Sequence, residues 1–336
     1  MSILVVIVNY RTAKLVVACL DSLALEVAAN PGTKVTIVDN ASGDGSGTTI
    51  AAAIAEQGWE NWAELVESPV NGGFAAGVNV GVRPALASGD VEFLWLLNPD
   101  TVVRPGAIAA LAGFMRARPT AGIAGSLLEL ADGTPWPFAF RFPGLLGEVE
   151  QGLRLGLATR LLRRHAVLRR MGSEPAQVDW VSGASFMVRR SVFEAIGLMD
   201  EAYFLYFEET DFCRAANRAG WECWYIPDAK VMHIAGQSTG VTGADAARQR
   251  RPGYWFESRR RYFVKNHGSL YAAATDLAWL VAYSVWTLRR KLTGAQSPDP
   301  PGLARDLLWH SPLLRWHSVA NRDTDRDAHR PRLEAH

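Results

Sequence analysis

Short apolar runs in the first hundred residues each end in polar residues of the kind that bind ligands. These runs lie at 3–8, 35–38, 65–66 and 93–97 and are separated by stretches of helical character. Such runs predict buried parallel strands, and their alternation with helices predicts βαβ units from residue 1 to about residue 130. Ligands of open α/β sheets bind at the carboxyl ends of the strands. The carboxylates, amides and glycines found there suit a phosphorylated, hydroxyl-rich ligand.

The same patterning predicts the remaining elements. Thr12 is a suitable N-cap for a helix that runs to about residue 29, and Pro105 suits the start of a later helix. In the first half, further helices are expected at 51–56, 78–87 and 106–117, and a further strand at 121–128. In the second half, we expect a strand at 181–188, a helix at 211–219 capped by Thr210 and followed by Gly220, and short strands at 222–227 and 230–233.

Residues 135–178 differ in character from both flanking regions. Prolines and glycines at the start of this stretch predict loops, and a run of arginines with interleaved leucines follows, without an acid from 154 to 170. Two interpretations are open. The arginines form either a solvated helix face or a basic surface for an anionic lipid or a diphosphate.

The segment 270–288 is almost entirely apolar or aromatic. It is interrupted by Asp276 and followed by Arg289, Arg290 and Lys291. A helix lying in a membrane interface fits this composition, whereas Asp276 makes a membrane-spanning helix costly. A buried helix or one that joins two copies in a homodimer is the third interpretation. The tail from about residue 318 is expected to pack loosely.

Bulk composition narrows the functional classes. Hydrophobic residues make up 49% and charged residues 21% of the 336 residues, which is typical of a folded protein, and the formal net charge of +1 gives no global drive toward nucleic acid. The three cysteines form no CxxC pair, which fits a reducing compartment. The first apolar run is too short for a signal peptide, so we expect a cytoplasmic protein.

Polar groups at three strand ends are candidate ligand contacts. Asp39 can accept hydrogen bonds from a base or a ribose, although its surroundings also suit a turn. The glycine-rich stretch 71–79 allows close approach of a ligand to the backbone, or is a plain tight turn. Asp100 can supply one hard oxygen to a divalent cation, with Asn98 as a neutral neighbour, or it caps the following helix.

Acidic and basic clusters in the second half are the other candidates. Glu208, Glu209 and Asp211 follow an aromatic run, where burial and like charge raise carboxyl pKa values and can poise a general base. Charge at a helix N-terminus accounts for part of this pattern, and Asp211 suits that role. His233 is a candidate metal ligand. Arg259 and Lys265 are candidates for a diphosphate or membrane contact.

Competing signatures are missing from the sequence. The stretch around Ser182 and Gly183 is not a GxSxG elbow, and the chain has neither an HExxH nor a GxGxxG motif. These observations disfavour a hydrolase, a zinc protease and a nicotinamide oxidoreductase. A sugar-phosphate nucleotidyltransferase is disfavoured because its glycine-rich activation loop is replaced by Asn9-Tyr10-Arg11.

Taken in order, these motifs resemble family-2 glycosyltransferases with the GT-A fold, and within them the bacterial rhamnosyltransferase-like enzymes of cell-surface polysaccharide assembly. The resemblance runs from about residue 3 to residue 267. It rests on the strings VIVNY, VDNASGDGS, NGGFAAGVNVG, LLNPDT, VSGASFMVRRSVFEAIGLMDEAYFLYFEETDFCRAANRAGW and HIAGQSTG.

The resemblance implies roles for individual residues. Asp39 matches the nucleoside-contacting aspartate, and Asp100 matches the last acid of the Asp-x-Asp metal motif, whose first acid is replaced by Asn98. Glu209 lies where the family has its general base, with Glu208 next in line, and His233 matches a histidine that can complete metal coordination. The implied nucleotide-sugar-binding set is Asn9, Tyr10, Asp39, Asn71, Gly73, Phe74, Asn79, Asn98 and Asp100, and the implied acceptor-binding set is Trp180, Ser182 and Gly183.

The implied fold is α/β, with a Rossmann-like, mostly parallel sheet flanked by helices over residues 1–267 and a C-terminal helical extension over 268–336. Within the first domain we expect a nucleotide-sugar-binding half at 1–130, a basic insertion at 135–178 and an acceptor and catalytic half at 179–240.

The implied activity is inverting transfer of a sugar, best rhamnose from dTDP-rhamnose, to a glycan or a polyprenyl-diphosphate-linked acceptor, with Mg²⁺ or Mn²⁺ as cofactor. The expected location is the inner face of the cytoplasmic membrane. The alternatives are transfer of galactofuranose or another UDP- or GDP-linked sugar, and a non-catalytic nucleotide-sugar-binding scaffold.

Overall fold

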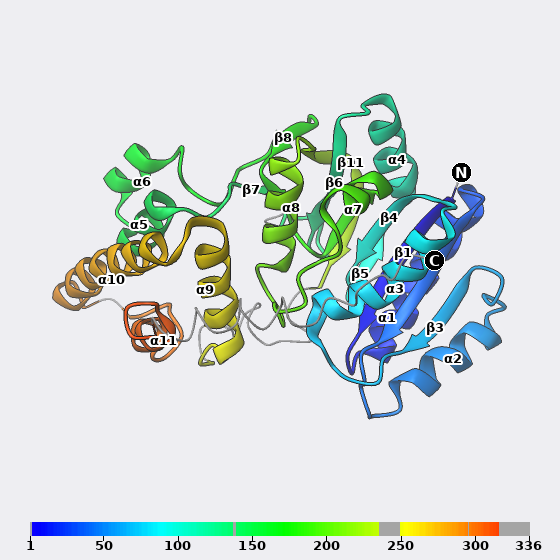
Figure 1. Cartoon of the computed structure of the whole chain (residues 1–336), viewed down its shortest axis with the longest axis horizontal. Helices are drawn as coiled ribbons and strands as arrows, with labels where there is room; N and C mark the ends of the chain where they lie inside the picture. Colours follow the sequence, from blue (N-terminus) through cyan, green and yellow to red (C-terminus); the bar gives the residue numbers. More distant parts are fainter. Residues whose placement is uncertain (1, 137–138, 235–248, 295, 316–336) are drawn as a thin grey trace, which may run out of the picture. The chain divides into compact units, whose positions relative to one another are not determined.

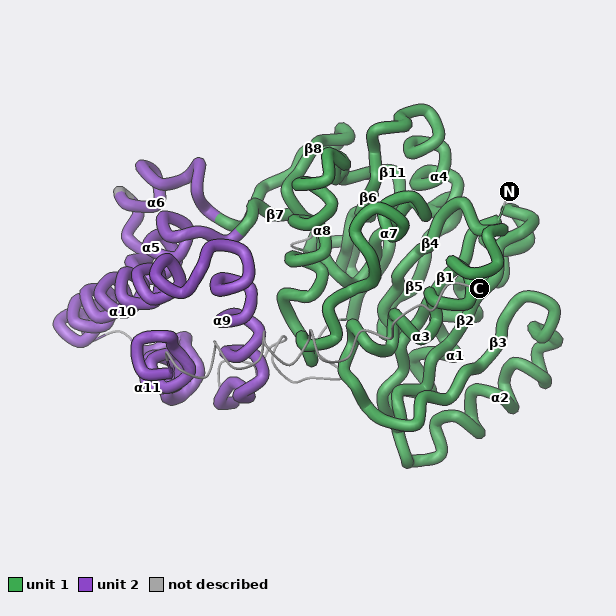
Figure 2. The backbone as a smooth tube through the Cα atoms, in the orientation of Figure 1, with its two compact units in different colours: residues 1–142, 167–245 green, residues 143–166, 246–336 purple. Residues whose placement is uncertain are grey.

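The structure is a computed structural model that describes residues 2–136, 139–234, 249–294 and 296–315. The chain separates into two compact units (Figure 2). Unit 1 comprises residues 1–142 and 167–245, and unit 2 comprises 143–166 and 246–336. Part of the basic insertion thus groups with the C-terminal helices, and the second unit takes in residues before the boundary expected at 267. The string HIAGQSTG continues past residue 234 and the C-terminal tail past residue 315, so both extend outside the described residues.

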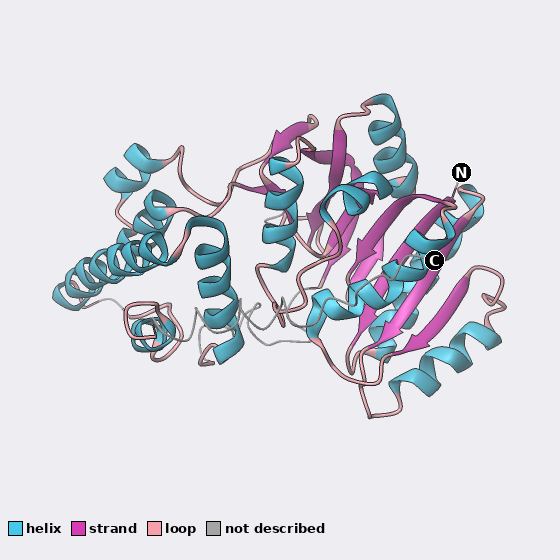
Figure 3. Ribbon diagram, viewed as in Figure 1, coloured by secondary structure: helices cyan, strands magenta, loops and turns pink. Residues whose placement is uncertain are grey.

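Unit 1 is built on a central sheet flanked by helices (Figures 1 and 3). The strands lie in the order β3-β2-β1-β4-β10-β6-β11-β5, and β8 pairs with β11. Pairing is parallel for β3-β2, β2-β1, β1-β4 and β6-β11, whereas β10, β5 and β8 run antiparallel to their neighbours. The strands are β1 (Ser2–Asn9), β2 (Thr33–Asp39), β3 (Ala63–Glu67), β4 (Val91–Leu97), β5 (Thr101–Val103), β6 (Ala121–Glu129), β8 (Ala176–Val178), β10 (Ser185–Arg189) and β11 (Glu222–His233). A separate pair joins β7 (Ala139–Phe140) to β9 (Trp180–Val181).

The predicted parallel strands are confirmed, and their burial explains the apolar runs. Residues 3–8 and 93–97 are all buried, as a sheet covered by helices requires. The helices of this unit are α1 (Ala13–Ala29), α2 (Ser46–Glu56), α3 (Gly73–Ser88), α4 (Ala107–Ala117), α7 (Arg190–Ile196) and α8 (Glu208–Arg218). Two glycines allow the helix α3 to pack closely on β1. A Cβ at Gly77 would lie under 3 Å from the side chain of Val8, and a Cβ at Gly81 would lie under 3 Å from that of Val6.

Several element boundaries differ from the prediction. The helices expected at 51–56 and 78–87 begin earlier, at Ser46 and Gly73, and the strands expected at 222–227 and 230–233 form one strand, β11, with a register shift between Ile226 and Lys230. The expected strand 181–188 is split into β9 and β10 by a turn at 182–184. The expected helix 211–219 begins at Glu208 instead, so Thr210 lies inside its first turn and Phe207 occupies the N-cap position. Tyr206 and Phe207 both have positive φ, at 69° and 68°, and this left-handed entry starts the helix three residues early. As a result, Glu208 and Glu209 belong to the first turn of α8.

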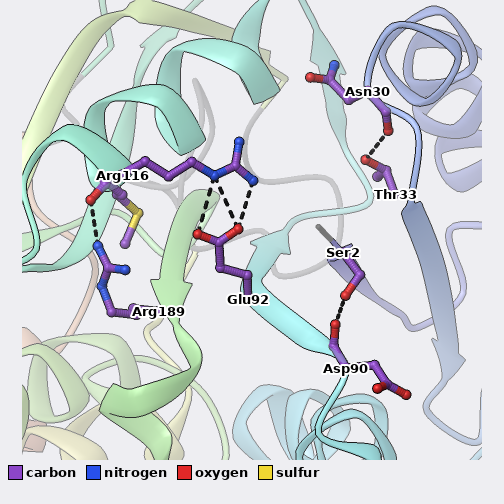
Figure 4. Close-up of polar contacts among 8 residues, drawn as sticks. Ser2, Asn30, Thr33, Asp90, Glu92, Arg116 and Arg189 are labelled. Atoms are coloured by element: carbon purple, nitrogen blue, oxygen red, sulfur yellow. Dashed lines mark hydrogen bonds and ion pairs between the residues drawn. The ribbon is translucent and has the colours of Figure 1, made fainter.

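The amino ends of the parallel strands are held together by polar contacts (Figure 4). Ser2 donates a hydrogen bond to the carbonyl of Asp90, which joins the starts of β1 and β4. The guanidinium of Arg116 binds the Glu92 carboxylate through Nε and Nη2 at 2.8–3.3 Å. Arg116 of α4 and Glu92 of β4 thus neutralise one another near this edge.

Unit 2 consists of helices organised around a buried ion-paired arginine. The side chain of Arg259 is only 4% exposed and binds both Glu148, at 2.7 Å, and Asp276. This corrects the expectation that Arg259 contacts a diphosphate or a membrane, because its charge is already neutralised inside the unit. The helices are α5 (Leu145–Leu153), α6 (Gly156–Leu162), α9 (Gly253–His267), α10 (Ser269–Leu292) and α11 (Leu303–His310).

The apolar segment 270–288 lies within α10. Asp276, which interrupts the apolar segment, is buried against Arg259, so the acid belongs to the core of unit 2. No helix in the described ranges combines the length and hydropathy that crossing a bilayer needs.

Candidate functional site

One edge of the sheet in unit 1 gathers the predicted site. The carboxyl ends of β1 to β4 meet there, and Asn9 lies opposite Asp39 in the parallel register. Strand β10 runs in the opposite direction with Ser185 opposite Leu97, which brings the turn 182–184 to the same edge. His233 lies opposite Thr101 where β11 pairs with β5. The topology therefore brings segments that are distant in sequence next to one another.

Asp39 is fixed by a buried hydrogen-bond network. Its Oδ1 accepts bonds from Asn9 Nδ2 and Ser42 Oγ, both at 2.6 Å, and its Oδ2 accepts the Ser42 backbone N–H at 3.2 Å. The other end of the Asn9 amide accepts bonds from the N–H and hydroxyl of Thr12. Asn9 therefore positions Asp39, and its own polar atoms are already engaged.

Strained backbone surrounds this carboxylate. Arg11 and Ala41 follow the ends of β1 and β2 with φ of 59° and 53°, which are uncommon for residues other than glycine. Arg11 donates its backbone N–H to Ser42 Oγ at 2.9 Å and its Nε to the Ser42 carbonyl at 3.0 Å. The guanidinium also lies 5.1 Å from the centre of the half-buried Tyr10 ring. Sequence reasoning missed both Ser42 and Arg11, although the strings VIVNY and VDNAS pointed to these strand ends.

The glycine-rich turn is tied to the loop that leads into α8. Asn40 donates to Asn71 Oδ1 at 2.9 Å and to the Gly73 carbonyl at 3.0 Å, and the N–H of Phe74 donates to the Phe204 carbonyl at 2.9 Å. Gly73 has φ of +86°, and a Cβ there would lie 1.9 Å from the Phe204 oxygen, so this position requires glycine. The loop before Glu208 is thereby held close to the ends of β2 and β3.

Asn79 does not lie at the ligand edge. It is buried in α3, where its Nδ2 donates to the Met199 carbonyl at 2.8 Å and to Glu201 at 2.9 Å, and its Oδ1 accepts the Met199 N–H at 3.1 Å. These bonds join α3 to the loop 199–201. The expectation that Asn79 contacts a nucleotide sugar is therefore corrected, because both ends of its amide are committed within the fold.

Asp100 and His233 form a close pair. His233 Nε2 lies 3.3 Å from Asp100 Oδ1, and both side chains are nearly buried. Adjacent ligands of an octahedral cation with bonds of about 2.1 Å are roughly 3 Å apart, so this pair fits two neighbouring positions around Mg²⁺ or Mn²⁺. No group of three or more metal-type side chains occurs among the described residues, so a bound substrate would have to supply further ligands.

Glu208 and Glu209 form a desolvated acidic pair in the first turn of α8. Burial, and to a lesser extent the charge of Glu209, raises the pKa of Glu208 well above its usual value. Burial also raises the pKa of Glu209, against hydrogen bonds from backbone N–H groups that include Gly183. The Oε2 atom of each side chain is shielded from solvent and has no hydrogen-bond partner within the described parts of the chain. Such a carboxylate can accept a proton from a bound substrate.

The turn 182–184 connects the segment of Asp100 to the acidic pair in α8. The position that a Cβ would take at Gly183 lies 3.5 Å from Glu209 Oε1, and the next residue, Ala184, accepts the N–H of Asn98 at 2.9 Å. The turn that carries Asp100 therefore contacts the same segment as Glu209. Trp180, which precedes the turn, stacks on Phe140 with ring centres 4.1 Å apart.

Most of the chain matches the model of a known protein family. The model described as "Glycosyltransferase like family 2" matches residues 2–254. The chain belongs to this family. The protein is therefore a glycosyltransferase, and the predicted family and GT-A type fold are confirmed.

Known relatives of this glycosyltransferase add detail. It is 31% identical over 282 residues to the N-acetylglucosaminyl-diphospho-decaprenol L-rhamnosyltransferase of Mycobacterium tuberculosis, with 80% of this chain and 84% of the relative covered. It is 24% identical to the dTDP-rhamnosyl transferase RfbF of Shigella flexneri, with 64% and 67% covered. The fold resembles the mannosyltransferase PcManGT of Pyrobaculum calidifontis in complex with GDP-Man and Mn²⁺, at 16% identity and a TM-score of 0.54, with 97% and 84% covered.

Not all predicted residues of the glycosyltransferase come together at this edge. Asn9, Tyr10, Asp39, Asn71, Gly73, Phe74, Asn98, Asp100 and His233 follow or flank the strand ends, and the turn 182–184 reaches Glu209. Asn79 is set back in α3. Arg259 and Lys265 belong to α9 of unit 2.

Replacement of the ionisable carboxyl of Glu208 by a neutral amide should stabilise the protein. A carboxyl whose folded pKa is raised above its unfolded value loses stability as pH rises from about 4.3 toward the folded pKa. We expect Glu208→Gln to raise the Tm of unit 1 at pH 8 by a few degrees, because about 1 kcal/mol corresponds to roughly 2–4 °C in a folding unit of about 150–250 residues. The increase should be smaller at pH 5. Thermal unfolding at both pH values measures this, and a Tm gain that does not depend on pH would contradict it.

Proposed function

We propose that this glycosyltransferase moves rhamnose from dTDP-rhamnose, with inversion, to a hydroxyl of a lipid-linked glycan in cell-surface polysaccharide synthesis. The observation that carries the proposal is the contact of Glu209 with Gly183, next to the Ala184–Asn98 hydrogen bond. The turn 182–184 thus contacts a potential base in α8 and is hydrogen-bonded to the turn that carries a potential diphosphate site. The names of the two rhamnosyltransferase relatives support the choice of sugar.

The nucleoside end of the donor would bind at the ends of β1 and β2. Hydrogen bonds from Asn9 and Ser42 fix the orientation of the Asp39 carboxylate before a ligand binds. The oxygen atoms that would accept hydrogen bonds from a base or ribose are therefore preorganised. The Arg11 guanidinium, fixed by Ser42, provides positive charge at the same strand ends.

The diphosphate would lie next to Asp100 and His233, the two residues that would hold a divalent cation. Bound Mg²⁺ or Mn²⁺ would stabilise the negative charge that develops on the leaving nucleoside diphosphate. The replacement of the first acid of the motif by Asn98 lowers the negative charge of the site, which favours an already anionic diphosphate. The protein supplies few ligands of its own, as is usual for cations that bind substrate phosphates.

Glu209 would accept the proton from the acceptor hydroxyl as that oxygen attacks the anomeric carbon. Its raised pKa makes it a stronger base than an exposed carboxylate, while the backbone N–H of Gly183 favours its ionised form. Glu208 stays protonated more readily because it is more deeply buried, and this reduces repulsion next to Glu209. Asp211 lies in the first turn of α8, where its negative charge would stabilise the positive end of the helix dipole.

The acceptor would approach from the turn 182–184, next to Trp180. A polyprenyl-diphosphate carrier would present the glycan at the cytoplasmic membrane surface. The name of the M. tuberculosis relative gives a sugar linked to diphospho-decaprenol as the acceptor of that enzyme, which supports an acceptor of this class. Galactofuranose and other UDP- or GDP-linked sugars are the alternative donors.

Glu209→Gln should abolish transfer and leave donor binding intact. Loss of a positioned general base typically lowers the rate by about 10²–10⁴-fold. Single-turnover transfer and calorimetric titration with dTDP-rhamnose measure the two effects separately. Glu194→Gln, an exposed acid on α7, is the matched control and should behave as wild type. Wild-type rates in Glu209→Gln would contradict the assignment, and a selective loss in Glu208→Gln would move the base to that residue.

A thermal-shift panel should identify the donor and the cation together. At 100 times its Kd, a ligand stabilises the folded state by about 2.7 kcal/mol, or roughly 5–10 °C. We expect dTDP-rhamnose with Mn²⁺ to give the largest shift, and Asp100→Asn to lose the part that depends on Mn²⁺. A larger shift with a UDP- or GDP-sugar would overturn the proposed donor. A shift that is indifferent to Mn²⁺ would overturn the cation site.

A further inference from the structure

Helix α10 of unit 2 (Figure 1) exposes an apolar stripe, which the exposures of its side chains define. A surface helix of a soluble protein ordinarily presents charged and polar residues to water. Here six of the exposed positions are large and aliphatic, and five of these are more than half exposed. The stripe consists of Leu270 at 78%, Leu277 at 53%, Val281 at 58%, Val285 at 47%, Leu288 at 61% and Leu292 at 80% exposure.

The stripe follows one side of the helix along almost its whole length. At about 100° per residue, its members fall within an arc of about 80° and extend over roughly 33 Å. The buried residues of α10, such as Thr275 and Trp279, lie on the opposite side. That side packs on α5, where a Cβ at Gly152 would lie 2.8 Å from the Cβ of Ala282. The core of unit 2 therefore uses one side of α10 and leaves the stripe exposed.

Charge on α10 has a single sign outside the core. Its one acid, Asp276, is buried and paired with Arg259. Arg289 and Lys291 are exposed in the last turn, and at 100° per residue they flank the stripe on either side. The exposed surface of α10 thus combines apolar and positively charged groups without a negative one.

We propose that the α10 stripe lies in the headgroup region of an anionic membrane, with Arg289 and Lys291 among the phosphates. The aliphatic side chains would enter the boundary of the acyl chains, and the two cations would bind the negative surface. Two copies of α10 paired along this stripe would lack acidic partners for the flanking cations, whereas coiled-coil seams usually provide them. The charge pattern therefore favours a lipid surface over a second copy.

This surface goes beyond the proposed reaction, because it fixes how unit 2 meets a membrane whichever sugar the enzyme transfers. The two proposals fail separately. Transfer to a soluble acceptor can be normal in a protein that does not bind vesicles, and vesicle binding can be normal when dTDP-rhamnose is not the donor.

Flotation with vesicles tests the surface. We expect the full chain to bind vesicles of phosphatidylcholine mixed with phosphatidylglycerol, and to bind pure phosphatidylcholine weakly. Leu277→Glu combined with Val281→Glu should lower partitioning by at least about tenfold, because it puts two anions into the apolar stripe. Arg289→Gln combined with Lys291→Gln should lower it by about 25-fold, since each basic residue near an anionic surface contributes about a factor of five. Leu25→Glu on α1, where Leu25 is 73% exposed, is the matched control and should bind as wild type.

Tm and light-scattering mass complete the test, and each variant should keep the wild-type Tm. Failure of the wild-type chain to float with anionic vesicles would overturn the proposal, and so would equal loss in the Leu25 control. A wild-type dimer that becomes a monomer in the Leu277 and Val281 double variant would also overturn it, because the stripe would then join two copies.

Discussion

The hydrogen bond from the Asn98 N–H to the Ala184 carbonyl is the contact on which the site depends. It joins the turn after β4, which carries Asp100, to the turn before β10, where Gly183 contacts Glu209. These segments are more than 80 residues apart in sequence. Antiparallel pairing of β10 with β4 brings them together, so the sheet register sets the relation between the proposed phosphate-binding group and the proposed base. Glycosyl transfer needs both groups around one sugar.

Desolvation then decides what the acidic groups can do. The Oε2 atoms of Glu208 and Glu209 are shielded from solvent, and burial raises the pKa of both carboxyls. In unit 2 the same burial has another outcome, because Arg259 neutralises Glu148 and Asp276. The buried acids of unit 2 are neutralised by a cation, whereas the Oε2 atoms of Glu208 and Glu209 have no hydrogen-bond partner among the described residues. This contrast separates the core of unit 2 from the candidate active site.

The sequence predicted the features that depend on local patterning. Apolar runs identified the parallel strands, and their polar ends identified Asp39 and Asp100 as candidates. Asn79 and Arg259 were misassigned because their partners, Met199 in one case and Glu148 in the other, are distant in sequence. The early start of α8 could not be predicted either, since positive φ at Tyr206 and Phe207 has no signal in residues other than glycine. Ser42 was missed because its role depends on the register of β1 and β2.

The central claim is that one bound donor touches both groups of the site. The most direct measurement is an anomalous difference map from crystals grown with dTDP and Mn²⁺. The account predicts a manganese peak between Asp100 and His233 with the diphosphate bound to it, and the Glu209 carboxylate facing the β-phosphate across a gap about as wide as one sugar ring. A diphosphate in a cavity separate from the one that Glu209 faces would contradict it.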